Sequence, residues 1–197
     1  MQRLYFKRVI IVTNNRKYTL SYIDPHKEVV ESCLMGNRQA QFELYRLYSK
    51  AMYNVCLRML KNSTDAEDVL QNSFMDAFNR LSTFGFQSSF GAWMKRIVIN
   101  NCINFLQRRK FSFDEYDANT HGKDAIQYEE DVTDEVLNVE RIQKAMAQLP
   151  DGYRVVFSLY MFEGYDHEEI SEVLKISEST SKSQFHRAKI KLKELLR

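Results

Sequence analysis

Apolar side chains recur at intervals of three and four residues over most of this chain, and that spacing places them on one face of an α-helix. The longest run, between residues 42 and 59, consists of Phe42, Tyr45, Tyr48, Met52, Val55, Cys56 and Met59. Residues that interrupt helices are scarce, since the 197 residues include only 6 Gly and 2 Pro. This scarcity argues against a β-sandwich with many tight turns. We therefore predict an all-α protein.

Charge is distributed unevenly along the chain. Residues 27–110 have a net charge of +5, whereas residues 111–140 contain ten acidic residues and one basic residue. Residues 111–138 also lack a sustained apolar stripe, so we predict an acidic flexible linker there. This linker would join two small helical domains, at residues 27–110 and 139–197.

The first 26 residues have a net charge of +4 and are predicted to be an N-terminal basic extension of unknown role. Apolar and basic residues alternate weakly over residues 3–23, a pattern compatible with a short hairpin and also with an unstructured arm. The dipeptide Asp24-Pro25 ends this stretch, because a residue before proline is held out of the helical conformation. We expect the rest of the chain to function without residues 1–24.

The sequence holds no pattern typical of an enzyme. The three cysteines, Cys33, Cys56 and Cys102, are far apart, and the four histidines match no metal-ligand spacing. Phosphate-binding glycine loops and nucleophile motifs are also missing from the sequence. We expect no catalytic residue, no metal, no cofactor and no small-molecule substrate. No apolar run reaches the roughly 20 residues of a membrane span, so we expect a cytoplasmic protein without membrane insertion.

The C-terminal residues predict a helix-turn-helix. A short helix is expected from Asp166 to Leu174, then a tight connection, then a second helix that Ser177 caps. Positions that include its outward face carry groups able to donate to phosphates and base edges: Thr180, Lys182, Ser183, Gln184, His186, Arg187 and Lys189. We interpret this helix as a DNA-binding element. The alternative is a plain surface helix whose cations suit its C-terminal end.

A second set of candidates begins in the loop at residues 82–91, where Phe84, Phe86 and Phe90 precede Trp93. The helix that follows carries a stripe of polar side chains: Lys95, Arg96, Asn100, Asn104 and Arg108. Aromatic rings let unstacked bases stack, while cations and amides donate to phosphates and base edges. The residues alone slightly favour a simpler arrangement, in which the aromatic rings are core and the amides are solvated.

A third candidate is the sequence TDAEDVLQNSF at residues 64–74, which brings Asp65, Glu67 and Asp68 together. Thr64 and Glu67 have the spacing of a capping box, and carboxylates are favourable in the first turn of a helix. A helix start is therefore a simpler explanation for these residues than acid–base or metal chemistry.

Three segments, in order, resemble the sigma-70 family, and specifically the two-domain extracytoplasmic-function (ECF) group of RNA polymerase sigma factors. They are TDAEDVLQNSFMDAF (64–78), FGFQSSFGAWMKRIVINNCINFLQRRK (84–110) and LPDGYRVVFSLYMFEGYDHEEISEVLKISESTSKSQFHRAKIKLKEL (149–195). The resemblance implies an alternative sigma factor that binds core RNA polymerase, directs it to −35/−10 promoters and assists promoter melting. Residues 27–110 would be sigma region 2, and residues 139–197 would be sigma region 4.

The resemblance also implies a role for each set of candidates. The acidic helix would dock on core polymerase through Asp65, Glu67, Asp68 and Gln71. The loop and the polar stripe would open the −10 element and read it as single strand through Phe84, Phe86, Lys95, Arg96, Asn100, Asn104 and Arg108. The C-terminal helix would read the −35 duplex through Thr180, Lys182, Ser183, His186, Arg187 and Lys189, with Arg154 on a phosphate. An anti-sigma factor is expected as a further partner.

Four residues depart from the family's usual pattern. Asn104 stands at a usual aspartate, and Lys175 stands at a usual turn glycine, where a left-handed conformation costs on the order of 1 kcal/mol. Ser181 and Gln184 replace the usual valine and arginine of the recognition helix, which would alter the promoter sequence that is read.

Two other functions compete with this interpretation. A stand-alone helix-turn-helix regulator, normally a dimer on a palindromic site, would leave residues 64–110 without a role. A DNA-independent adaptor would leave the basic C-terminal helix without one. Dependence on core polymerase for specific promoter binding separates the three.

Overall fold

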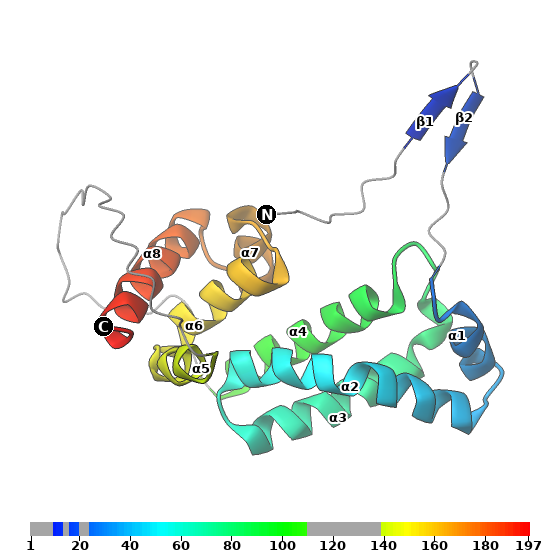
Figure 1. Ribbon diagram of the computed structural model, residues 1–197, viewed down its shortest axis with the longest axis horizontal. Helices are drawn as coiled ribbons and strands as arrows, with labels where there is room; N and C mark the ends of the chain where they lie inside the picture. The colour runs from blue at the N-terminus through cyan, green and yellow to red at the C-terminus, as the bar shows by residue number, and fades with distance from the viewer. Residues whose placement is uncertain (1–9, 14–15, 20–23, 110–138) are drawn as a thin grey trace. The chain divides into compact units, whose positions relative to one another are not determined.

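The computed structural model describes residues 10–13, 16–19, 24–109 and 139–197 (Figure 1). The chain divides into two compact units, residues 1–108 and 109–197. The predicted acidic linker at residues 111–138 lies outside the described residues. No described helix is both long enough and apolar enough to cross a membrane.

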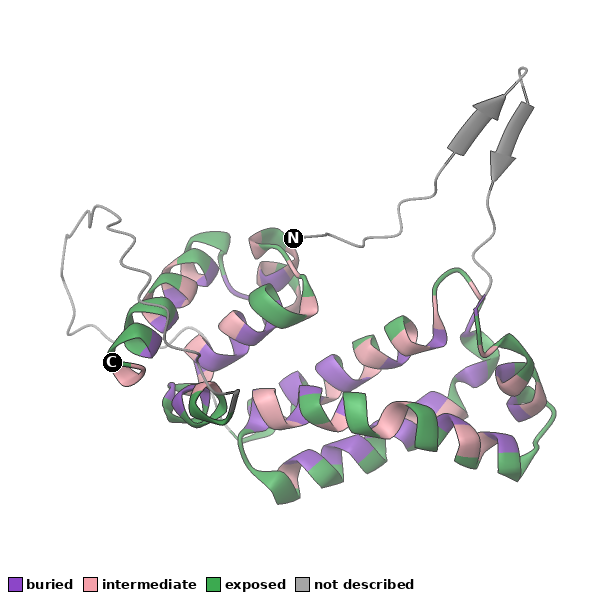
Figure 2. Cartoon of the chain, viewed as in Figure 1, coloured by how far each residue is buried: buried purple, intermediate pink, exposed green. Residues whose placement is uncertain are grey.

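The first unit is a helical bundle preceded by a hairpin. Its elements are β1 (Ile10–Thr13), β2 (Arg16–Thr19), α1 (Lys27–Leu34), α2 (Arg38–Leu60), α3 (Ser63–Asn79), the 3-10 turn η1 (Leu81–Thr83) and α4 (Phe90–Arg108). α2, α3 and α4 pack pairwise against one another, and α1 packs against α2. Figure 2 shows buried residues recurring along the facing sides of these helices.

The two strands pair antiparallel, with Ile10 opposite Thr19 and Thr13 opposite Arg16. The hairpin alternative for the N-terminal stretch is therefore confirmed. Among the described residues these strands are the one departure from an all-α fold, and they lie outside the bundle helices.

The long helix predicted around residues 42–59 is confirmed as α2, but its buried face was wrong at the N-terminal end. Phe42 is 67% exposed, whereas Ala40 and Leu44 are buried. Phe42 lies two residues from each of them, and two residues turn an α-helix by about 200°, to its opposite side. Tyr45 is 37% exposed, and its ring contacts Phe74 of α3.

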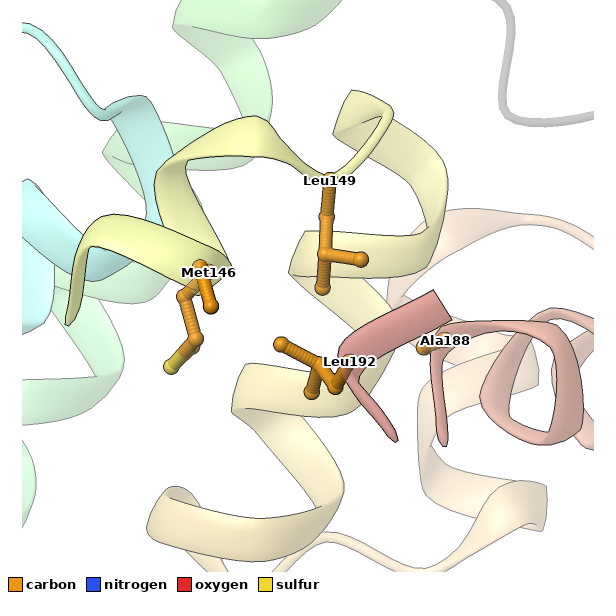
Figure 3. Close-up of a cluster of buried hydrophobic side chains, with 5 residues drawn as sticks. Met146, Leu149, Ala188 and Leu192 are labelled. Atoms are coloured by element: carbon orange, nitrogen blue, oxygen red, sulfur yellow. The ribbon is translucent and has the colours of Figure 1, made fainter. Parts of the chain in front are cut away.

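The second unit contains α5 (Val139–Gln148), α6 (Asp151–Ser158), the π-helical turn η2 (Leu159–Glu163), α7 (His167–Leu174) and α8 (Glu178–Leu195). α8 packs against α5, α6 and α7. One core cluster joins the end of α5 to α8, where Met146 and Leu149 face Ala188 and Leu192 (Figure 3). These contacts fix which side of α8 is left to solvent.

Candidate nucleic-acid interface

The predicted helix-turn-helix is confirmed as α7 and α8, and its sequence explains both helix starts. Asp166 caps α7 by accepting from the Glu169 N–H at 2.9 Å, and Glu169 Oε2 accepts from the Asp166 N–H at 2.9 Å. Ser177 Oγ caps α8 by accepting from the Thr180 N–H at 3.0 Å. Between them Lys175 adopts the left-handed conformation, with φ of 58° and ψ of 43°. That conformation is the one expected at a turn position that usually carries glycine.

The outward side of α8 carries most of the predicted candidates. Lys182, His186 and Lys189 are exposed and follow the i, i+4, i+7 spacing of one helix face. Thr180, Ser183 and Arg187 are half-buried. The Lys182 ammonium lies 2.7 Å from the Glu178 carboxylate, and both side chains remain more than half exposed. This face is therefore basic and open to a ligand.

Arg154 does not lie on that face, and its surroundings are interior, so its phosphate contact stays a prediction. The side chain is 1% exposed. Its Nη1 donates to the Leu149 carbonyl at 3.0 Å, and its Nη2 lies 2.5 Å from Asp151 Oδ1. Arg154 holds the end of α5 to the start of α6, and this engagement keeps its guanidinium inside the domain.

Gln184 and Ser181 are also buried, at 6% and 0% exposure, so the outward placement of Gln184 was wrong. Ser181 Oγ lies 2.9 Å from His167 Nδ1. Gln184 packs on Gly152 of α6, where an added Cβ would lie 3.1 Å from Gln184 Oε1. Both side chains face the inside of the domain and join α8 to its neighbours, and the effect of these two departures on the promoter sequence stays a prediction.

His167 is a residue that the sequence analysis missed. Its ring stacks on Tyr160 with centroids 4.7 Å apart and contacts Phe185 edge-on. Burial lowers the pKa of His167, and the nearby Lys182 ammonium lowers this pKa further. Because the ring partners of His167 come from η2 and α8, no local spacing marks this residue.

In the first unit, the aromatic loop does not present all of its rings. Phe84 is 5% exposed and packs against Phe86, Phe90 and Trp93 at centroid distances of 4.8, 5.9 and 5.3 Å. These three rings cover much of the Phe84 ring, so its stacking on a base stays a prediction that would require these contacts to open. Phe86 is half-buried, and its φ of 52° is unusual for a residue other than glycine.

The polar stripe on α4 lies where the sequence predicted it. Arg96, Asn100, Asn104 and Arg108 are exposed at four-residue steps, and Lys95 is half-buried. The opposite side of the helix is apolar and buried against α2 and α3. Asn101 lies beside this stripe and donates to Asp76 Oδ2 at 2.9 Å and to Ser73 Oγ at 3.1 Å, which ties α4 to α3.

The acidic candidates lie at the start of α3. Glu67, Asp68 and Gln71 are exposed, and Asp65 is half-buried. The predicted capping box at Thr64 is wrong, because the helix begins two residues earlier and Asn62 Oδ1 accepts from the Asp65 N–H at 3.0 Å. The described residues contain no group of three or more His, Cys, Asp and Glu side chains arranged to hold a metal ion.

Comparison with known proteins gives each unit a counterpart. Residues 44–112 match the model for Sigma-70 region 2, and residues 139–192 match the model for Sigma-70, region 4. The ECF RNA polymerase sigma factor SigW of Bacillus subtilis is 29% identical over 181 residues, which cover 87% of this chain and 96% of SigW. The chain belongs to the sigma-70 family, in its ECF group. As an ECF alternative sigma factor it directs RNA polymerase to promoters, and it is a non-catalytic polymerase subunit.

Other relatives agree with this assignment. The ECF RNA polymerase sigma factor SigM of Mycobacterium tuberculosis is 26% identical over 172 residues, which cover 86% of this sigma factor and 83% of SigM. A similar fold occurs in the sigma factor RpoE of Bartonella quintana, solved in complex with the anti-sigma factor NepR. The TM-score is 0.51, with 23% identity and coverage of 78% of this chain and 94% of RpoE.

Proposed function

We propose that this sigma factor divides promoter recognition between its two units, with residues 139–197 on the −35 duplex and residues 27–110 on the melted −10 element. The acidic residues 111–138 would connect them. The observation that carries the proposal is the exposed basic face of α8, which stands on a helix-turn-helix with both helix starts capped. A helix in this setting enters the major groove, where base edges are distinguishable.

On the −35 side, residues 175–197 contain seven basic and two acidic residues, a net charge of +5. Lys182, His186 and Lys189 form the exposed face that would meet the groove, and Thr180, Ser183 and Arg187 would flank it. Lysine contacts to phosphate supply affinity that weakens as salt rises, because binding releases counterions from DNA.

On the −10 side, the proposed reader is the exposed stripe Lys95, Arg96, Asn100, Asn104 and Arg108 together with the half-buried ring of Phe86. Amides and guanidinium groups suit the edges and phosphates of unstacked bases, and an aromatic ring suits their faces. Phe84 would instead hold the Phe86 ring in place by packing against it, at a centroid distance of 4.8 Å.

For core polymerase, we propose docking through the start of α3. Asp65, Glu67, Asp68 and Gln71 form an acidic edge that lies on a different helix from the DNA-facing stripe of α4. This separation of charge lets one small unit bind a protein through carboxylates and a polyanion through cations.

An anti-sigma factor is proposed as a further partner, because RpoE of Bartonella quintana was solved in complex with the anti-sigma factor NepR. CnrH was likewise solved in complex with another chain, the cytosolic domain of CnrY. A cytoplasmic location follows from the proposal, since core polymerase and promoter DNA are found there.

The test is in-vitro transcription from a library of DNA fragments with purified core polymerase, with and without this protein. New start sites that share two spaced upstream motifs are expected. If no new starts arise while the protein alone binds DNA specifically, the stand-alone regulator replaces the proposed division of labour.

Two double variants assign the surfaces. Lys182→Ala with Arg187→Ala should weaken promoter engagement and leave core affinity unchanged, whereas Asp65→Ala with Asp68→Ala should weaken core affinity. Lys191→Ala is a matched control, because Lys191 also pairs with an exposed glutamate on α8, at 3.0 Å, but lies near its C-terminal end. Equal loss of core affinity in both doubles would overturn the assignment.

A further inference from the structure

Residues 24–27, called here the N-terminal clasp, lie against the first turn of α4. Asp24 is 3% exposed although it precedes the first helix. Its Oδ2 accepts from the Phe90 N–H at 2.5 Å, and its Oδ1 accepts from the His26 N–H at 2.7 Å. The first amides of a helix have no partner within the helix, and a carboxylate both satisfies them and suits the positive end of the helix dipole. Asp24, which lies within the predicted extension of residues 1–26, is thus bonded to the start of α4.

The second contact of the clasp fixes the same turn from the side of α2. His26 Nδ1 lies 2.7 Å from the Tyr48 hydroxyl. The Tyr48 ring packs on Phe90 with centroids 5.1 Å apart, and it also lies directly against Gly91. A Cβ at Gly91 would be 2.7 Å from Tyr48 Cε1, so this approach requires glycine.

The third contact reaches the tip of the aromatic loop. The Lys27 ammonium lies 5.8 Å from the centroid of the Phe86 ring, within range of a cation–π interaction. Phe86 holds a left-handed backbone, which persists in a residue other than glycine only where its surroundings fix it. Here the Phe86 ring contacts both the Lys27 ammonium and the ring of Phe84.

We infer that the N-terminal clasp positions the residue 84–90 loop for base selection at the −10 element, with Asp24 and Lys27 as positioning residues that do not themselves touch the base. Asp24 fixes the end of the loop where α4 begins, and Lys27 fixes the Phe86 ring at its tip. The inference rests on the proposed function of this loop. It connects a segment far earlier in the chain to the geometry of the proposed single-strand reader.

The test measures base discrimination by the reconstituted holoenzyme, the full-length protein with core polymerase. The probes are a labelled single-stranded oligonucleotide carrying the mapped −10 sequence and the same oligonucleotide with one base of that sequence replaced. We expect Asp24→Ala to reduce the ratio of the two dissociation constants at least threefold. Core affinity and binding of −35 duplex should stay within twofold of the unchanged protein.

Three further variants guard against simple unfolding. Lys27→Met keeps the aliphatic stem of an exposed residue and removes the cation, so it should reduce discrimination while Lys27→Arg restores it. Asn37→Ala is the matched control, because Asn37 Oδ1 caps α2 by accepting from Gln39 and Ala40 N–H at 2.9 and 3.3 Å, away from the loop. Its discrimination ratio should equal that of the unchanged protein.

Unchanged discrimination in both Asp24→Ala and Lys27→Met would overturn the inference. So would an equal loss of core affinity and −10 binding in Asp24→Ala, since that result marks a purely structural residue. If the unchanged holoenzyme itself shows no preference between the two oligonucleotides, it is the proposed −10 role of the loop that fails.

Discussion

Replacing Arg154 by methionine tests whether this residue serves the interior or the DNA. Methionine keeps much of the aliphatic stem and removes the guanidinium, and with it the bond to the Leu149 carbonyl at 3.0 Å and the pairing with Asp151 at 2.5 Å. Leu149 is 1% exposed, so its carbonyl has little access to replacement water. The change therefore removes the two interactions by which Arg154 joins the end of α5 to the start of α6.

Hydrogen bonds from charged groups contribute about 1.5–3 kcal/mol each, and an unpaired buried partner adds to the loss. The Asp151 side chain is 27% exposed, although the Oδ1 atom that faces Arg154 is buried, and we expect a total loss of about 3 kcal/mol for the second unit. In a domain of this size such a loss lowers the midpoint of thermal unfolding by roughly 12–24 °C. A phosphate contact predicts a different result. Stability would be unchanged, and the slope of the logarithm of promoter affinity against the logarithm of salt concentration would decrease by about one.

The assay is calorimetry of the full chain together with promoter binding by holoenzyme at several salt concentrations. Lys182→Met provides the reciprocal control. Lys182 is 58% exposed in its ion pair, so its removal should change stability by less than about 1 kcal/mol and should reduce the salt dependence. Unchanged thermal unfolding of Arg154→Met, with a reduced salt dependence, would refute the structural assignment of this arginine.

Three more predictions follow from the described contacts. Burial, aided by Glu43, raises the pKa of Cys33 to about 11, so a thiol reagent at pH 8 should modify Cys33 only after unfolding, and rapid modification of the folded protein would contradict this. Deleting residues 1–22 should leave thermal unfolding unchanged, whereas deleting residues 1–24 should cost about 1–2 kcal/mol through the lost cap on α4; equal midpoints would contradict the anchoring role of Asp24. The pKa of His167 is lowered from 6.5 in the folded protein, so His167 takes up a proton in the unfolded chain first as the pH falls. The free energy of unfolding should therefore decrease below pH 6.5. In calorimetry across pH 5–8, His167→Gln should make that decrease smaller.

The helices themselves follow from local signals in the sequence. Periodic apolar residues and the side chains of Asp166 and Ser177 placed α7 and α8 correctly, because capping bonds join residues only three apart. The stripe on α4 was equally predictable, since a four-residue step returns to the same side of any helix. At the start of α3 the sequence predicted a cap at Thr64, and the structure instead uses Asn62, two residues earlier.

Which side of each helix meets solvent was decided by tertiary packing. Arg154 and Gln184 were predicted to face DNA, yet both are buried: Arg154 bonds to Leu149 and Asp151, and Gln184 packs on Gly152 of α6. Phe84 and Phe86 are two residues apart and chemically identical, but the first is covered by Phe90 and Trp93 and the second is not fully covered. Asp24 meets the N–H of a residue 66 positions later, a contact that no local pattern encodes. Periodicity and capping act within a few residues, so the sequence alone determined the helices and their order. Burial depends on which distant element packs against each face of a helix, and only the tertiary structure decides that.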